Sequence, residues 1–305
     1  MFYRRDFLKG SAILAVAGIF PGLFEVASAA SVASTPSDFT LWQLPLHQSP
    51  AQGNSYVFRT TKGKVIVMDG GVPDEAGYLR GFLAALGNEV EAWFLSHPHT
   101  DHIGALHEIL KKPDGIKINS IYHSEFSKEF YEKVEPQAMP RTIDFYDRLK
   151  KRENPATNIQ EPGLVIDIDN VKFKILAVKN EELTVNAYNN SSMVIRVWDS
   201  VRSVLFLGDA GAEEGDKILL SPFRNELDSD FVQMAHHGQR GVRKEFYQSF
   251  KFKACLWPTP LWLYNNDQGK GFNTANFETV KTREWMKEAG IQKHFVSADG
   301  LYVID

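Results

Sequence analysis

The stretch from Ser96 to Leu106 constrains the fold of this chain more than any other. It reads Ser-His-Pro-His-Thr-Asp-His-Ile-Gly-Ala-Leu, and it brings His97, His99, Asp101 and His102 within six residues. Neutral imidazole and carboxylate are groups through which proteins bind zinc, manganese and iron. A single histidine is usually an ordinary surface or core residue, but four such groups together are costly to bury without a shared partner. The stretch therefore predicts a metal centre.

This motif lies where a buried strand turns into a helix. An apolar run of strand length, residues 91–95, precedes it, and apolar residues at helical spacing follow it. Because alternate residues of an extended chain face the same side, His97 and His99 should face one ion. Asp101 and His102, at the turn, can then face another. We expect two metal ions side by side.

The motif resembles the signature of the metallo-β-lactamase superfamily, whose members are hydrolases with one or two metal ions. The resemblance implies an α/β fold of the αββα type, in which two mixed β-sheets lie between helices. Residues 39–305 would form this domain, with a helical insert at about 125–163. The expected cofactor is Zn²⁺, as one or two ions, with Mn²⁺ or Fe²⁺ as alternatives. Strand-like runs support two sheets, at residues 39–44, 55–59, 64–68, 164–168, 171–176, 193–198 and 203–207.

Two later segments supply further candidate ligands. A buried strand delivers Asp209 at its end, where a carboxylate either caps the next helix or binds metal. In the superfamily a Gly-Asp at this point bridges two metals, so the resemblance favours Asp209 as the bridge. His236 and His237 follow another strand, and two adjacent residues of a strand point to opposite sides. The resemblance makes His236 the ligand and His237 a group that contacts substrate or donates a proton, although the order can be reversed.

A supporting role is expected for Asp69, which ends a strand in the sequence Asp-Gly-Gly. The family's early aspartate orients a metal ligand from outside the coordination sphere, and the resemblance assigns Asp69 that role. An ordinary Asp-Gly turn is the alternative. In the expected mechanism Asp101 or Asp209 orients a metal-activated water, and His237 or Lys270 assists the leaving group or holds an anion.

Several motifs together resemble the hydrolase domain of ComEC-type DNA-uptake proteins and its stand-alone relatives. They are the histidine motif, residues 189–194, Leu-Gly-Asp-Ala and His-His-Gly. Two departures matter. The third histidine of the first metal site is missing from residues 187–191, so an asparagine carbonyl or a water would fill the gap. Asn190 is expected to support a metal ligand from outside the coordination sphere or to contact substrate. Residues 265–272 lack the histidine of that branch's Asn-x-x-Gly-His-Pro run, so DNA is not implied as the substrate.

The N-terminus resembles a twin-arginine export signal. Arg4 and Arg5 precede an apolar stretch, and Ala27-Ser28-Ala29 offers a cleavage site. A membrane anchor is the alternative, but the stretch is short for a spanning helix. We therefore expect residues 1–29 to be a signal peptide and 30–38 a linker. The mature protein would be periplasmic or otherwise extracytoplasmic, would meet the export machinery, and would have no membrane span.

Composition narrows the remaining choices. The chain is 43% hydrophobic and 24% charged, as in soluble globular proteins, and its formal net charge is −4. There is no basic excess of the kind that grips nucleic acid along a surface. A single cysteine, Cys255, excludes an internal disulfide and lies in an apolar run, which predicts a buried, inert thiol.

The insert is charge-rich and helical in composition over residues 127–153, with breaks predicted at Pro136 and Pro140. Its aromatic residues either pack the insert onto the body or form a lid over the site, and packing is the favoured prediction. The residues in question are Phe126, Phe130, Tyr131, Met139, Phe145 and Tyr146.

The sequence thus predicts a metallohydrolase with a small-molecule or phosphodiester substrate, the phosphodiester being favoured. A lactone, thioester or β-lactam hydrolase is the alternative enzyme. A non-catalytic metal-binding module on the same fold is the alternative of a different class. The sequence does not predict an oligomeric state.

Overall fold

The computed structural model describes residues 36–46 and 52–304. The predicted signal peptide, residues 1–29, lies outside the described residues, as do residues 30–35 of the predicted linker. Within the described ranges, every helix is too short or too polar to cross a membrane. The predicted signal and its cleavage therefore stay predictions.

Seven strands form the first sheet, in the order β14-β1-β2-β3-β4-β5-β6. Strands β3 to β6 run parallel, whereas β14, β1, β2 and β3 pair antiparallel. Strand β3 is buried along its whole length. A strand covered on both faces needs no polar alternation, which explains its nearly continuous apolar sequence. The strands are β1 (Phe39–Gln43), β2 (Ser55–Thr60), β3 (Val65–Asp69), β4 (Glu89–Phe94), β5 (Lys117–His123), β6 (Thr157–Asn158) and β14 (Tyr302–Ile304).

The second sheet also has seven strands, in the order β13-β12-β11-β10-β9-β8-β7. Its strands β7 to β10 pair antiparallel and β10 to β13 run parallel. The predicted hairpin is confirmed, with Asp169 in the left-handed conformation that tight hairpin turns require. The strands are β7 (Val165–Ile168), β8 (Val171–Ile175), β9 (Ile195–Trp198), β10 (Ser203–Phe206), β11 (Phe231–Gln233), β12 (Ala254–Trp257) and β13 (Lys293–Val296).

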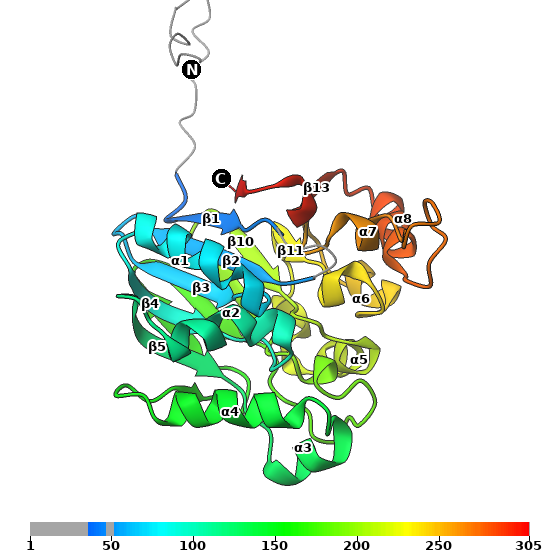
Figure 1. Cartoon of the computed structure of the whole chain (residues 1–305). Coiled ribbons are helices and arrows are strands. Elements are labelled where there is room, and N and C mark those ends of the chain that lie inside the picture. The colour runs from blue at the N-terminus through cyan, green and yellow to red at the C-terminus, as the bar shows by residue number, and fades with distance from the viewer. Residues whose placement is uncertain (1–35, 47–51, 305) are drawn as a thin grey trace, which may run out of the picture. The chain divides into compact units, whose positions relative to one another are not determined.

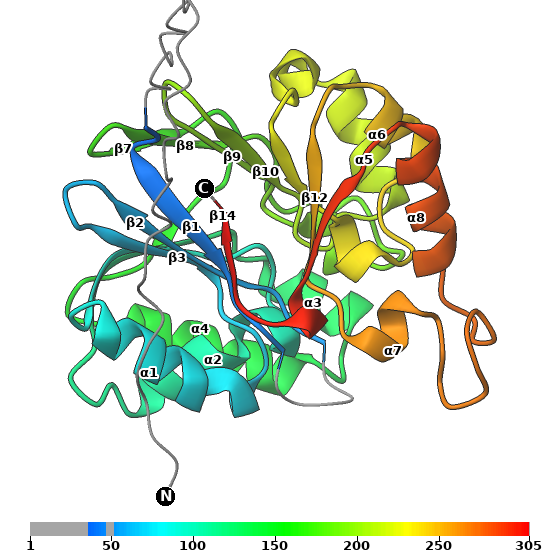
Figure 2. The same cartoon turned by 90° about the horizontal axis from the view of Figure 1, so that it is seen from above.

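Helices cover the outer face of each sheet (Figures 1 and 2). One apolar cluster lies between the first sheet and its helices, a second between the two sheets, and a third between the second sheet and its helices. This arrangement confirms the predicted αββα sandwich of two mixed sheets. The helices are α1 (Ala76–Ala85), α2 (Thr100–Lys111), α3 (Lys128–Val134) and α4 (Met139–Lys150) on the first side, and α5 (Ala212–Leu220), α6 (Lys244–Gln248), α7 (Leu261–Tyr264) and α8 (Thr279–Glu288) later in the chain.

The insert contributes α3 and α4, which are separated at residues 135–138. The predicted break at Pro140 was wrong, since Pro140 lies in the first turn of α4, where its missing N–H has no helical partner to lose. The prediction that the aromatic residues pack the insert onto the body is confirmed. The buried ones are Phe126, Phe130, Tyr131, Phe145 and Tyr146.

The fold brings chemistry-bearing residues to one edge of the sandwich. Asp69 ends β3 and the histidine motif follows β4, both in the first sheet. Asp209 follows β10 and the His236–His237 pair follows β11, both in the second sheet. The neighbouring parallel strands of each sheet end at a shared edge, and open α/β sheets bind ligands beyond the carboxyl ends of their strands. We therefore expect the functional site at the edge where both sheets meet.

Candidate metal centre

Four side chains from both sheets converge at this edge. Among the described residues, Asp101, His102, Asp209 and His237 each offer one ligand atom, and these atoms all lie within 4.8 Å of one another. His237 Nε2 lies 3.1 Å from Asp101 Oδ2 and 3.4 Å from Asp209 Oδ2. His102 Nε2 lies 3.1 Å from Asp209 Oδ1. We call these four residues the metal cluster.

Two buried atoms of the metal cluster lie close together without a well-directed hydrogen bond. His102 Nε2 and Asp209 Oδ1 are 3.1 Å apart, and neither has a well-directed hydrogen bond to any described residue. Buried polar atoms are rarely left in that state unless an ion or water completes them. Two carboxylates and two imidazoles are also a donor set that Zn²⁺, Mn²⁺ or Fe²⁺ accepts. The residues present therefore fit a divalent cation.

The field inside the metal cluster is negative. Burial disfavours ionised Asp209, but His102 and His237 outweigh it and hold the pKa of Asp209 well below its usual range. Burial likewise disfavours the imidazolium of His237, yet the charges and hydrogen bonds of Asp209 and Asp101 raise its pKa to about 10. A site that attracts a proton this strongly also attracts a metal cation, because both neutralise the same two carboxylates.

The start of α2 determines the position of Asp101. His99 is the N-cap residue of α2, so Asp101 lies in the first turn of that helix, where the helix dipole favours a negative charge. Gly104 follows in the same helix. A Cβ at Gly104 would lie 2.5 Å from the Pro73 ring, so only glycine lets α2 pack this closely against the segment at Pro73. The glycine of the motif is thus a packing requirement.

Asp69 holds the His102 ring. Its Oδ2 lies 2.8 Å from His102 Nδ1, which leaves Nε2 free to face the metal cluster. Asp69 also accepts hydrogen bonds from Ser96 N, Ser96 Oγ and Asn54 Nδ2, each at 2.7–2.8 Å. The carboxylate is fully buried. This geometry matches the supporting role predicted for Asp69 rather than that of a simple turn.

His97 and His99 form a second group beside the metal cluster. Their rings face each other, with His97 Nε2 3.0 Å from His99 Nδ1, as the alternation of an extended chain predicts. His97 Nε2 also lies 3.9 Å from Asp209 Oδ2. Burial lowers the pKa of His97 and favours the neutral imidazole that metals bind. Asp209 thus lies between this pair and the metal cluster.

The histidine pair after β11 adopts the reverse of the expected order. His237 lies in the metal cluster, with Nδ1 2.7 Å from the Pro258 carbonyl, to which it donates. His236 lies outside the metal cluster, with Nε2 3.9 Å from Asp209 Oδ2 and 3.3 Å from Asn189 Nδ2. Both histidines have left-handed backbone conformations. Strained backbone of this kind persists where the surrounding structure enforces it, and functional sites are one such place.

Three other predicted residues take the following places. The N-cap of α5 is Gly211, so Asp209 is not a helix cap, which was the less favoured of its two predicted roles. Asn190 caps that helix instead, because its Oδ1 accepts from Glu214 N while its Nδ2 donates to Val185 O and Glu213. These three contacts of the Asn190 amide are all with residues outside the metal cluster, and its predicted role beside a ligand or substrate stays a prediction. Lys270 is exposed and makes no contact with the described site residues.

Two residues that contact the candidate ligands, Ser192 and Glu135, were not predicted from the sequence. Ser192 Oγ accepts from Asp209 N and lies 3.4 Å from His97 Nδ1. Glu135, from the insert, lies 2.8 Å from His99 Nε2. No spacing pattern links either residue to the motif. Cys255, by contrast, is buried as predicted, and burial raises its thiol pKa.

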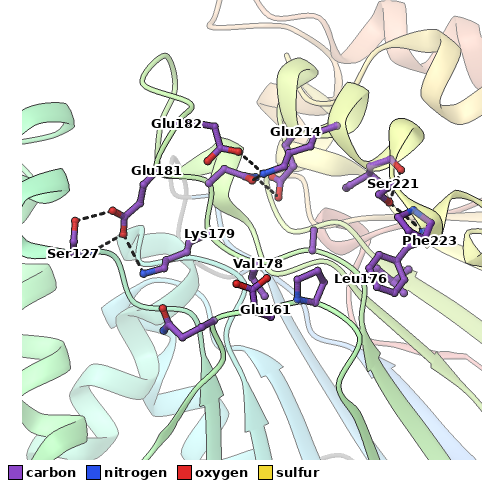
Figure 3. Close-up of a pocket in the computed structure, with 17 residues that line it drawn as sticks. Ser127, Glu161, Leu176, Val178, Lys179, Glu181, Glu182, Glu214, Ser221 and Phe223 are labelled. Atoms are coloured by element: carbon purple, nitrogen blue, oxygen red, sulfur yellow. Dashed lines mark hydrogen bonds and ion pairs between the residues drawn. The ribbon is translucent and has the colours of Figure 1, made fainter.

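A cavity of about 610 Å³ is lined by residues that include none of the candidate ligands (Figure 3). Leu176, Val178 and Phe223 supply its apolar wall, and Figure 3 shows Glu214 at its side. Burial raises the pKa of Glu214, which accepts from Ser192 N. Ser192 therefore links Glu214, in the lining of the cavity, to the backbone of Asp209.

Comparison with known proteins agrees with this geometry. A model of the metallo-beta-lactamase superfamily matches residues 49–246, more than half of the chain. No curated protein matches the sequence. The structure is similar to the metallo-beta-lactamase fold protein YhfI from Bacillus subtilis, with a TM-score of 0.53 and 11% identity, over 88% of this chain and 99% of that one. It is also similar to a mutant of the CmlA beta-hydroxylase, with a TM-score of 0.52 and 11% identity, over 88% of this chain and 54% of that one. At these identities the likeness concerns the fold alone.

Proposed function

The chain belongs to the metallo-beta-lactamase superfamily, and on that premise we propose that it is an exported metal-dependent hydrolase of phosphodiesters. The observation that carries the proposal is the position of Asp209. Its two oxygens lie 3.1 Å from His102 Nε2 and 3.9 Å from His97 Nε2. One carboxylate thereby reaches both histidine groups, as a bridge between two cations requires.

The metal cluster would hold one cation, and His97, His99 and Asp209 would hold a second. Zn²⁺ is the first choice because imidazole nitrogens and carboxylates make up the donor set. When bound, such ions lower the pKa of a water towards neutrality and polarise the scissile oxygen. Asp101 and Asp209 accept protons and orient the nucleophile, since His102 and His237 outweigh the opposing effect of burial and hold the pKa of both carboxyls below the usual range.

His236 is our candidate for the histidine that contacts substrate. It is 14% exposed, whereas His237 is fully buried. Its Nε2 lies 3.0–3.3 Å from the side-chain amides of Gln239 and Asn189 and 3.9 Å from Asp209 Oδ2. A partly exposed imidazole beside the cations can contact substrate or transfer a proton. We assign His236 this role, which the sequence had suggested for its neighbour.

Three features favour a phosphodiester over a β-lactam. Residues 187–191 contain no histidine, so the three-histidine site of most superfamily members is absent. The combination of the histidine motif with Leu-Gly-Asp-Ala and His-His-Gly resembles the ComEC-type branch. Two cations are also suited to a phosphodiester, because they can stabilise both the attacking and the leaving oxygen.

The test is a substrate panel with the purified protein. We expect hydrolysis of bis(p-nitrophenyl) phosphate that a chelator removes and added Zn²⁺ or Mn²⁺ restores. Nitrocefin and a γ-lactone in the same panel identify the alternative enzymes. Turnover of nitrocefin or lactone with none of the phosphodiester would contradict the proposed substrate class. Metal binding without turnover of any substrate would favour a non-catalytic module.

Export by the twin-arginine route is part of the same proposal. Its support is the Arg4-Arg5 pair before an apolar stretch and a small-residue cleavage site. We expect the exported protein to begin near Ala30 and to lose export when Arg4 and Arg5 are both replaced by lysine. N-terminal sequencing of the periplasmic fraction checks both points. A full-length N-terminus retained in the cytoplasm would contradict export.

A further inference from the structure

We propose that Glu135 is a positioning residue that fixes the ring of His99 and so couples the helical insert to the weaker of the two cation sites. The inference rests on the proposed metal centre. It adds a residue that the sequence motif does not include, 36 positions after His99. It also gives the insert a function beyond packing.

The geometry at Glu135 joins three segments of the chain. Glu135 follows α3 directly, as its C-cap residue. Its Oε2 lies 2.8 Å from His99 Nε2, and its Oε1 accepts from Tyr188 N at 3.1 Å. The Glu135 side chain is only 17% exposed and that of His99 25%. Both carboxylate oxygens are therefore committed, one to the ring and one to the segment before Asn189.

The contact with Glu135 determines which nitrogen of His99 can bind metal. A carboxylate is an acceptor, so it takes the N–H of Nε2 and leaves the lone pair on Nδ1. His99 Nδ1 faces His97 Nε2 at 3.0 Å. The outer nitrogen of His97, Nδ1, lies near Ser96 Oγ and Ser192 Oγ. The two inner nitrogens thus converge while oxygens engage the two outer ones, which is how metal-binding histidines are usually held.

Tyr188 explains why the site depends on this carboxylate. It lies in the stretch where most superfamily members have their third histidine, and its ring stacks on His99 with centroids 5.2 Å apart. The cation position at His97, His99 and Asp209 therefore has one imidazole fewer than usual, and the orientation of His99 matters more. Glu135 holds both the His99 ring and the Tyr188 backbone, so one side chain sets their relative position.

The insert offers a matched control. Asp144, on α4, lies 2.8 Å from Nε2 of His107, which is in α2 but not in the metal site. Asp144→Asn therefore weakens a similar carboxylate–histidine contact between the same insert and the same helix. A role in docking the insert predicts similar effects for both positions. A role in positioning a metal ligand predicts an effect at Glu135 alone.

The experiment titrates the metal-free full chain with Co²⁺ and follows visible absorption, alongside kcat and KM with bis(p-nitrophenyl) phosphate. We expect Glu135→Ala to weaken the second of two binding steps by about 10–100-fold, as for other residues that orient metal ligands. Glu135→Gln should lie between wild type and Glu135→Ala, because an amide has one acceptor oxygen for two donors. Asp144→Asn should bind Co²⁺ as wild type does. Circular dichroism of each variant verifies the fold.

Each outcome decides the matter. Unchanged Co²⁺ binding in a folded Glu135→Ala variant overturns the inference, while wild-type binding and turnover leave the proposed function intact. Equal weakening in Glu135→Ala and Asp144→Asn also overturns it, in favour of a docking role. Failure of the wild type to bind Co²⁺ would remove the proposed function as well, since Glu135 would then have no ligand to position.

Discussion

Replacement of Asp209 by alanine should lower the hydrolytic rate by about 10³-fold or more. Asp209 is buried and is the group that reaches both His102 and His97. Its loss removes a negative charge from both cation positions, and the transition-state stabilisation supplied by bound metal amounts to several kcal/mol. Each 1.36 kcal/mol corresponds to a tenfold change in rate. Initial rates with a phosphodiester substrate measure the effect.

Two variants sharpen this experiment. Asp209→Asn keeps the shape of the side chain and removes its charge, so it should lose nearly as much activity as alanine. Asp216→Ala removes a half-exposed carboxylate from α5 that pairs with Arg243 at the surface, and it should retain wild-type rates. Turnover in Asp209→Ala that matches the Asp216 control would contradict a catalytic role for Asp209.

Replacement of Asp69 by alanine should cost about 3–5 kcal/mol of folding free energy in the metal-free protein. The carboxylate is fully buried and accepts from four donors, which belong to Ser96, Asn54 and His102. Each buried donor left without an acceptor costs about 1–3 kcal/mol, partly relieved when the side chains move. Urea unfolding after metal removal separates this effect from metal binding, which itself contributes to stability.

A second consequence of Asp69→Ala is weaker metal binding. Without Asp69, the His102 ring is free to turn, and we expect affinity at the metal cluster to fall about 10–100-fold. Asp74→Ala, an exposed aspartate five residues on, should change stability by less than about 0.5 kcal/mol. Equal stability of the Asp69 and Asp74 variants would show that the hydrogen bonds at Asp69 contribute little.

The sequence was sufficient for the fold and for three of the four residues of the metal cluster, Asp101, His102 and Asp209. Strand-length apolar runs and one hairpin turn predicted most strands, because alternation and turn chemistry are local properties. The motif from His97 to His102 predicted two groups of ligands, since four metal-binding side chains at a strand end have few other uses. Strand β12 was not predicted, because a short buried run lacks a period that separates strand from helix. Strand β13 was not predicted either, and only its last residue is buried.

The arrangement around the ligands could not be predicted from local patterns. The order of His236 and His237 depends on two left-handed residues in succession, and no propensity foretells that turn. Asn190 was expected near the metals, but its Oδ1 accepts a hydrogen bond from Glu214 N in the first turn of α5. Glu135 reaches His99 only because the insert packs against α2. Each of these contacts joins segments far apart in the chain, so tertiary packing decides them.

The most direct test of this account is the metal content of the purified protein without residues 1–29, measured by elemental mass spectrometry after loading and dialysis. The account predicts one tightly held equivalent of Zn²⁺, Mn²⁺ or Fe²⁺ in the metal cluster and a second, weaker one beside His97 and His99. Both should disappear in Asp209→Ala. A wild-type protein that retains no metal after loading would contradict the account.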